Sequence, residues 1–162
     1  MKLGGSDYVV VPDSPSVGVS GPMTVAAWIR PSSVATQYVV KKAAQGSVDG
    51  YEVGLSSGGK VFVRLNQASS GNTFRVDSTS SYPVDGTTWM HVAGVFDGSR
   101  VRLFINGVEQ GSVAGPGAVG SNALDLFLGA GESGYRPLVG GLDEVGVYSG
   151  ALTAQQIADL AT

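Results

Sequence analysis

Few residues in this 162-residue sequence could catalyse a reaction. The chain has no cysteine, which excludes thiolate nucleophiles, thiolate zinc sites and disulfide frameworks. Its one histidine, His91, cannot by itself supply the two or three imidazoles of a common catalytic zinc site. No serine lies in a nucleophile motif that would pair with this histidine. We therefore interpret His91 as a hydrogen-bonded residue of the core.

Carboxylates could instead cleave a glycosidic bond, but their spacing does not favour it. A retaining glycosidase needs two carboxyl groups about 5 Å apart, and a strand brings two together only at positions that share a face. The nearest acidic pair is Asp143-Glu144. Neighbours along a strand point to opposite faces, so we expect that this pair cannot flank one sugar linkage.

Arginines at alternating positions are better suited to binding than to catalysis. In the segment 61–66 the aliphatic residues alternate with Arg64 and Asn66, which would point away from the core. Arg75 and Arg102 hold equivalent positions in two further segments. If these strands are neighbours, the side chains share one surface that could bind a carboxylated or sulfated glycan.

The alternative is that these arginines are ordinary surface charges. Arg64 and Arg75 could pair with Glu52 and Asp77 across strands, which would leave no free guanidinium for a ligand. The sequence alone does not separate the two interpretations.

A second candidate binding surface is the loop 131–137. Tyr135 and Arg136 would form an aromatic and charged tip there, and sugar rings bind on flat aromatic faces beside planar polar groups. Trp28 and Trp89 lie in the most apolar segments, and we predict that both belong to the core.

Short alternating segments must position these residues. Charged residues make up only 14% of the chain, and glycine occurs 25 times, which is typical of many short strands joined by tight turns. Eleven segments are predicted to be strands: 8–11, 23–30, 38–42, 51–55, 61–66, 73–77, 89–96, 100–106, 108–113, 124–128 and 139–148. The fold class is therefore all-β, a two-sheet antiparallel β-sandwich (jelly roll) in a single domain of residues 1–162.

A short helix is predicted to close the chain. Leu152, Ile157 and Leu160 recur at helical spacing. Thr153 is the expected N-cap, and Gln156 three residues later would complete a capping box.

Charge and hydropathy limit the partners. The net charge is −3, so the broad positive field that holds a phosphate backbone is missing, and we expect no nucleic acid partner. No apolar run approaches the length of a membrane span, and no segment resembles a signal peptide, so no membrane insertion is predicted.

Several segments in this order resemble the laminin G-like jelly rolls of the concanavalin A-like lectin/glucanase superfamily, in their bacterial carbohydrate-binding-module form. The resemblance spans nearly the whole chain. It rests on the following segments: Gly5-Ser6-Asp7-Tyr8-Val9, Met23 to Pro31, Tyr51 to Leu55, Thr88 to Ala93, Phe96-Asp97-Gly98, Val101 to Gly107, Gly141 to Val145 and Ala151 to Ile157.

The resemblance implies a structural calcium ion at the rim of the sandwich. Asp143, in the closing Asp-Glu motif, would be the first ligand, and Asp7 in the opening motif the second. The glycine-rich turn at Gly46 could add a main-chain carbonyl. Without calcium, Asp143 would cap neighbouring turns and Asp7 would be a solvated residue at the start of a strand.

The function that the resemblance implies is non-catalytic binding. We expect a lectin-like module that directs an attached protein to a polysaccharide or oligosaccharide, as part of a larger extracellular or cell-surface protein. The alternative is a protein-interaction or adhesion domain of the same fold without a sugar site. A glycoside hydrolase or polysaccharide lyase is a third interpretation, because members of this superfamily also catalyse those reactions and fold alone fixes no activity.

Overall fold

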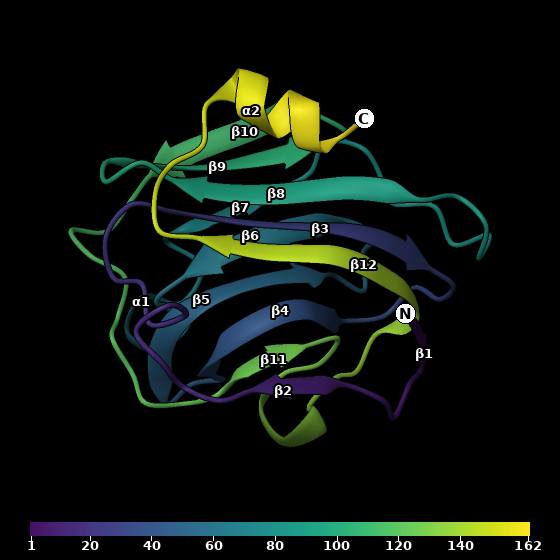
Figure 1. Ribbon diagram of the computed structural model, residues 1–162, viewed down its shortest axis with the longest axis horizontal. Coiled ribbons are helices and arrows are strands. Elements are labelled where there is room, and N and C mark those ends of the chain that lie inside the picture. Colours follow the sequence, from purple (N-terminus) through teal and green to yellow (C-terminus); the bar gives the residue numbers. More distant parts are fainter.

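Two six-stranded antiparallel sheets lie face to face in the computed structural model, which describes all 162 residues (Figure 1). Sheet A has the strand order β1 (Lys2–Gly4), β12 (Val139–Tyr148), β3 (Met23–Pro31), β8 (Met90–Phe96), β9 (Arg100–Ile105) and β10 (Val108–Ala114). Sheet B has the order β2 (Val9–Val11), β11 (Leu126–Leu128), β4 (Gln37–Ala44), β5 (Val48–Leu55), β6 (Val61–Leu65) and β7 (Arg75–Asp77). The predicted antiparallel β-sandwich is confirmed.

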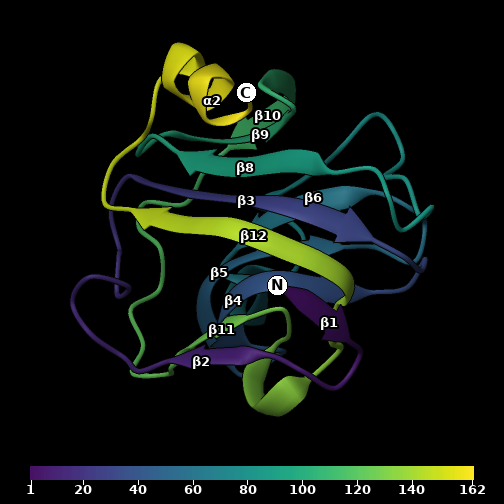
Figure 2. The ribbon, with the colours of Figure 1, turned by 45° about the vertical axis from the view of Figure 1, so that its right-hand side comes forward.

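One strand was not predicted from the sequence. Strand β1 pairs with β12 at the edge of sheet A, beside the end of β12 where that strand begins (Figure 2). It has only three residues, and its last residue, Gly4, and the Gly5 that follows leave no alternation of apolar and polar residues to recognise. Its pairing therefore depends on a partner that lies far away in the sequence.

Local turn chemistry explains the meander β8–β9–β10. Asp97 Oδ1 accepts hydrogen bonds from the N–H groups of Ser99 and Arg100, at 2.9 and 2.7 Å, and so closes the first turn. At the second turn, Asn106 and Gly107 have φ angles of 48° and 79°, the left-handed values that two-residue hairpin loops require.

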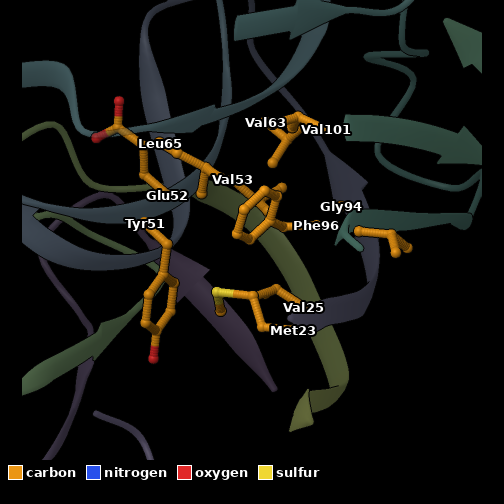
Figure 3. A pocket seen from close by; sticks show the side chains of 11 residues that line it. Met23, Val25, Tyr51, Glu52, Val53, Val63, Leu65, Gly94, Phe96 and Val101 are labelled. Atoms are coloured by element: carbon orange, nitrogen blue, oxygen red, sulfur yellow. The ribbon is translucent and has the colours of Figure 1, made fainter. Parts of the chain in front are cut away.

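The main core lies between the two sheets. It contains 26 buried residues, most of them aliphatic and contributed by the inner faces of both sheets. A void of about 10 Å³ remains beside Met23, Val53 and Phe96, which is near the lower limit for one water molecule. Figure 3 shows these side chains around the void, whereas the carboxylate of Glu52 is turned away from it. This void is a packing defect of the core and offers no ligand site.

The C-terminal helix α2 (Ala154–Leu160) covers part of the outer face of sheet A (Figure 1). Ile157 is fully buried there against Ala93, Val95 and Phe104. The predicted capping box is confirmed, because Thr153 and the third residue of the helix exchange both of its hydrogen bonds. Two short turns complete the fold: α1 (Gln67–Ser70) and the 3₁₀ turn η1 (Glu132–Gly134). No helix is both long enough and apolar enough to cross a bilayer.

The tryptophans do not lie where the sequence predicted. Trp28 and Trp89 are half-buried on the outer face of sheet A, because Ile29 and Met90 take the inward positions beside them. The indole of Trp89 lies against Gly141, where a Cβ would come within 2.7 Å of the ring. Alternation separates the two faces of a strand but does not say which one faces the core.

His91 is buried, as predicted, with 2% of its surface exposed. It lies on the outer face of sheet A, however, because Met90 and Val92 take the inward positions, and its side chain does not form the predicted hydrogen bond. Its ring lies 5.4 Å from that of Trp28, and its Nδ1 atom has no hydrogen-bond partner. Burial lowers the pKa of His91 below its ordinary value, because the charged imidazolium is poorly solvated there.

This burial predicts a pH dependence of stability. As the pH falls from 7 to 5, His91 takes up a proton more readily in the unfolded chain than in the folded one, so the free energy of unfolding should fall. The loss should correspond to the uptake of at most one proton on unfolding. Urea titrations at several pH values should show a shallower dependence for His91→Gln, and equal slopes would contradict this account.

Candidate functional site

A ladder of charged side chains crosses the outer face of sheet B. Strand register places Lys41, Glu52, Arg64 and Arg75 side by side on β4, β5, β6 and β7. Glu52 is the centre of the ladder: it lies 3.3 Å from the ammonium of Lys41 and accepts a hydrogen bond from the guanidinium of Arg64. The side chain of Glu52 is only 1% exposed. Lys41, Glu52 and Arg64 therefore form a buried ionic network, and Arg75 lies at its more exposed end.

Aromatic rings form a second row beside these charges. The rings of Tyr38 and Phe62 meet edge to face at 6.3 Å. The ammonium of Lys41 lies 3.9 Å above the ring of Tyr38, and the guanidinium of Arg75 lies 4.0 Å above that of Phe62. Burial, followed in size by the charge of Glu52, raises the pKa of Tyr38. This row supports the surface from below and presents little ring area to a ligand.

The segment that follows η1 exposes an aromatic ring beside this network. Tyr135 is 38% exposed and lies 6.2 Å from the buried ring of Tyr38. The guanidinium of Arg136 stacks on the ring of Tyr135 at 4.9 Å. On the other side of the turn, the ring of Tyr8 lies against Gly134, and Tyr8 is 39% exposed. We call the exposed residues Tyr8, Tyr135 and Arg136 the tyrosine platform.

The platform is anchored to sheet B by hydrogen bonds. The main-chain carbonyl of Arg136 accepts a bond of 3.0 Å from the N–H of Tyr38, and Gly131 donates one of 2.7 Å to the carbonyl of Tyr135. Glu132 accepts a bond of 3.1 Å from the N–H of Gln45 and lies 3.4 Å from Lys41. The η1 turn lies beside β2 and β11 in both views (Figures 1 and 2). A rigid support of this kind limits the entropy lost when a ligand binds.

Most charges on this face already have partners. Arg75 forms two hydrogen bonds with Asp77, at 2.6 and 2.9 Å. Arg64 is bonded to Glu52 and also donates to Asn72 at 2.7 Å. Arg136 forms no ion pair, so its guanidinium is the cation that is free to bind a ligand on this face.

The predicted arginine surface is therefore only part of the observed one. Arg64 and Arg75 are neighbours, as predicted, but both pair with acidic side chains, as the alternative interpretation expected. Arg75 pairs along its own strand rather than across strands. Arg102 lies on β9 of sheet A, where it bonds Asp97 and Glu109 in a hollow of about 310 Å³ beside α2. It does not share a surface with the other two.

Asn66, predicted to bind a ligand, uses its side chain to bond the main chain instead. It adopts a left-handed φ of 52°, its amide donates to the carbonyl of Ala118 at 2.9 Å, and its Oδ1 accepts from Gly120 at 2.8 Å. Its side chain therefore holds the connection between β10 and β11 and is not free to contact a ligand.

The three predicted calcium ligands do not come together. The carboxylate of Asp7 accepts a hydrogen bond from Gly4, which pairs with Val139, whereas Asp143 lies four residues further along β12, about 13 Å away. Gly46 lies in the β4–β5 turn of sheet B, against α1. No cluster of three or more acidic, histidine or cysteine side chains exists in the chain. This donor set does not fit one calcium ion.

The acidic pair Asp143-Glu144 departs from the expected alternation. A β-bulge follows Asp143, and Glu144 has a φ of 46°, so both side chains are exposed instead of pointing to opposite faces. Neither residue lines a cavity. The other close acidic pair, Glu52 and Glu132, has the ammonium of Lys41 between its two carboxylates.

Several residues of the site were missed by sequence reasoning. Tyr8 was included in a predicted strand and in the opening motif of the resemblance but not as a binding residue, and Lys41 was not singled out. Phe62 alternates with the same aliphatic residues as Arg64 and so shares its outer face, but the contact between the guanidinium of Arg75 and this ring depends on the register of β6 and β7.

Comparison with known proteins identifies the family. The Laminin_G_3 family model, described as the concanavalin A-like lectin/glucanases superfamily, matches residues 3–158, and the chain belongs to this family. No curated protein matched the sequence.

Three solved structures have the same fold at low sequence identity. The CBM40 of the Ruminococcus gnavus IT-sialidase, bound to α2,3 sialyllactose, has a TM-score of 0.79 at 16% identity, over 100% of this chain and 96% of that one. Domain 4 of AbnA, a GH43 extracellular arabinanase from Geobacillus stearothermophilus, was solved in complex with arabinotriose. It has a TM-score of 0.75 at 24% sequence identity, over 99% of this chain and 75% of that one. The binding domain of Paraclostridial Mosquitocidal Protein 1 has a TM-score of 0.77 at 17% sequence identity. The match covers 98% of this chain but 42% of that one, so the chain spans less than half of that structure.

Proposed function

We propose that this domain is a non-catalytic carbohydrate-binding module whose sugar site is the tyrosine platform. The observation that carries the proposal is the exposed ring of Tyr135, stacked against the unpaired guanidinium of Arg136 on a turn anchored to β4. A pyranose ring presents a C–H face that packs on such a ring, and its hydroxyl or carboxylate groups accept hydrogen bonds from a guanidinium.

The positions of the carboxylates support binding rather than cleavage. Hydrolysis requires two accessible carboxyl groups on either side of one linkage. Glu52 is buried between two cations, and Glu132 shares the ammonium of Lys41. Both groups are therefore held in the ionic network, which leaves neither of them poised to transfer a proton to a sugar.

The structural relatives support a role beside an enzyme or a surface. Two of them are binding domains whose structures contain sialyllactose and arabinotriose, and the second belongs to an extracellular enzyme. We propose that this domain likewise directs an attached protein to a glycan outside the cell. The platform has one free cation, so it should accept neutral glycans as well as acidic ones.

Affinity electrophoresis in gels that contain neutral or acidic polysaccharides tests this proposal. The wild-type domain should be retarded by at least one polysaccharide. Arg136→Gln should weaken retention by an acidic polysaccharide about tenfold, because a hydrogen bond to a charged group is lost, and should change retention by a neutral one less. Arg100→Gln, on sheet A, is the matched control.

Two outcomes would contradict the proposal. Failure of every polysaccharide to retard the wild-type domain would favour a protein-interaction or adhesion role instead. Release of reducing sugar or of unsaturated products from a bound polysaccharide would show an enzyme.

A further inference from the structure

The ammonium group of Lys42 lies in a cage of oxygen atoms at one end of the sandwich. Lys42 is paired with Tyr51, a residue of the inter-sheet core, and is only 1% exposed. Its Nζ atom lies 2.7 Å from Oδ1 of Asp13, and 3.2 and 3.4 Å from the carbonyl oxygen and Oδ1 of Asn122. It also donates a hydrogen bond to the carbonyl of Leu124.

These oxygens come from segments that are distant in sequence. Asp13 follows β2, whereas Asn122 and Leu124 belong to the connection that leads from β10 in sheet A to β11 in sheet B. The amide of Asn122 donates to the carbonyls of Lys42 and Asp49, at 3.1 and 2.8 Å, which fixes the orientation of its Oδ1 atom. The ammonium thus ties β4 to two connections at the end of the sandwich.

The oxygen atoms of this cage are of the kinds that calcium prefers as ligands. One carboxylate, one side-chain amide oxygen and two main-chain carbonyls converge on a single positive charge. The carboxylate of Asp13 balances the charge of the ammonium. The residues that family resemblance nominated for calcium, in contrast, do not share one coordination sphere.

We propose that Lys42 supplies the cation of this cage, so that the stability of the domain does not depend on divalent ions. The same oxygens would form a calcium site when the lysine side chain is shortened, because the cage would then hold a carboxylate without a compensating charge. This inference concerns the end of the sandwich and is independent of the proposed sugar site.

Thermal unfolding with and without divalent ions tests the proposal. The wild-type domain should melt at the same temperature in EDTA and in millimolar CaCl₂. Lys42→Ala should melt about 10 °C lower in EDTA, since the oxygens of the cage lose the buried ammonium that they share, and CaCl₂ should restore several degrees. Calorimetric titration with CaCl₂ should give heat of binding for Lys42→Ala and none for the wild type.

Two further variants keep the test decisive. Lys42→Met fills the space without a charge, so it should lose stability and not regain it with CaCl₂. Lys60→Ala removes a lysine that bonds only the carbonyl of Thr79 on the surface, and its melting temperature should change little. If Lys42→Ala does not fold in either buffer, Asp13→Asn replaces it, and this variant should melt several degrees below the wild type in both buffers.

Three results would overturn the proposal. A lower melting temperature of the wild type in EDTA would show that the domain needs a divalent ion of its own. A Lys42→Ala or Asp13→Asn variant as stable as the wild type would show that the ammonium does not tie the end of the sandwich together. A Lys42→Ala variant that folds but gains no more from CaCl₂ than Lys60→Ala would show that the cage does not bind cations.

Discussion

Replacing Glu52 by glutamine is expected to lower the free energy of unfolding by about 3–5 kcal/mol. Glu52 balances two buried cations, Lys41 and Arg64, whose side chains are 0% and 8% exposed. Glutamine keeps the volume but removes the charge, so two positive groups would remain in a poorly solvated place with only Glu132 to balance them. Urea denaturation followed by tryptophan fluorescence would measure the loss.

A matched control separates burial from charge alone. Asp77→Asn removes a carboxylate from the same face, but Asp77 is 43% exposed and its pair with Arg75 is open to solvent, so the cost should be below about 1 kcal/mol. The double variant Glu52→Gln/Arg64→Met should lose less than the sum of the two single losses, because it removes a cation together with the anion. Equal effects of Glu52→Gln and Asp77→Asn would contradict a buried network.

Replacing Tyr135 by alanine is expected to weaken glycan binding by 10-fold to 100-fold, or about 1.4–3 kcal/mol. The exposed ring of Tyr135 provides the flat face on which a sugar would stack, and the variant also removes the surface that holds the guanidinium of Arg136. Isothermal calorimetry with an oligosaccharide of the retained polysaccharide would measure the change in affinity.

Two controls make the loss specific to the platform. Tyr135→Phe keeps the ring and should retain most of the affinity, whereas Tyr148→Ala removes an equally exposed tyrosine from β12 of sheet A and should leave binding unchanged. The Tyr135→Ala variant should unfold close to the wild-type midpoint because the side chain is exposed. Unchanged affinity in Tyr135→Ala would place the sugar site elsewhere.

The sequence predicted the architecture better than it predicted which faces are buried. Alternation and turn residues such as Asn106-Gly107 identified eleven of the strands, because strand periodicity and hairpin chemistry are local. Strand β1 was missed because its pairing is not local. Trp28 and Trp89 were assigned to the core because the strands around them are apolar on both faces, and a helix that packs on the outer face of sheet A explains part of that pattern.

The candidate site was predictable to the extent that it depends on alternation. That Arg64 and Arg75 share a face follows from their positions in two successive segments. That Glu52 neutralises Arg64 depends on the register between β5 and β6, and that Arg102 lies elsewhere depends on the sheet to which β9 belongs. Neither fact is encoded in local periodicity.

The burial of the two consecutive lysines, Lys41 and Lys42, could not be predicted from the local sequence either. Lys41 points to the outer face of sheet B and Lys42 to the end of the core, and both are buried. A run of two lysines in a sequence is usually solvated, because burying an ammonium requires partners that compensate for its lost hydration. One partner comes from the next strand, β5, and the others come from more distant segments: the residues after β2, the η1 turn and the connection after β10.

The most direct test of the proposed sugar site is an NMR titration of the ¹⁵N-labelled domain with an oligosaccharide of the retained polysaccharide. Binding at the tyrosine platform predicts that the amide signals of residues 131–137 and of Tyr8 shift most, with smaller changes on β4. Shifts concentrated in the hollow around Arg102 and α2, or around Asp143, would contradict this account.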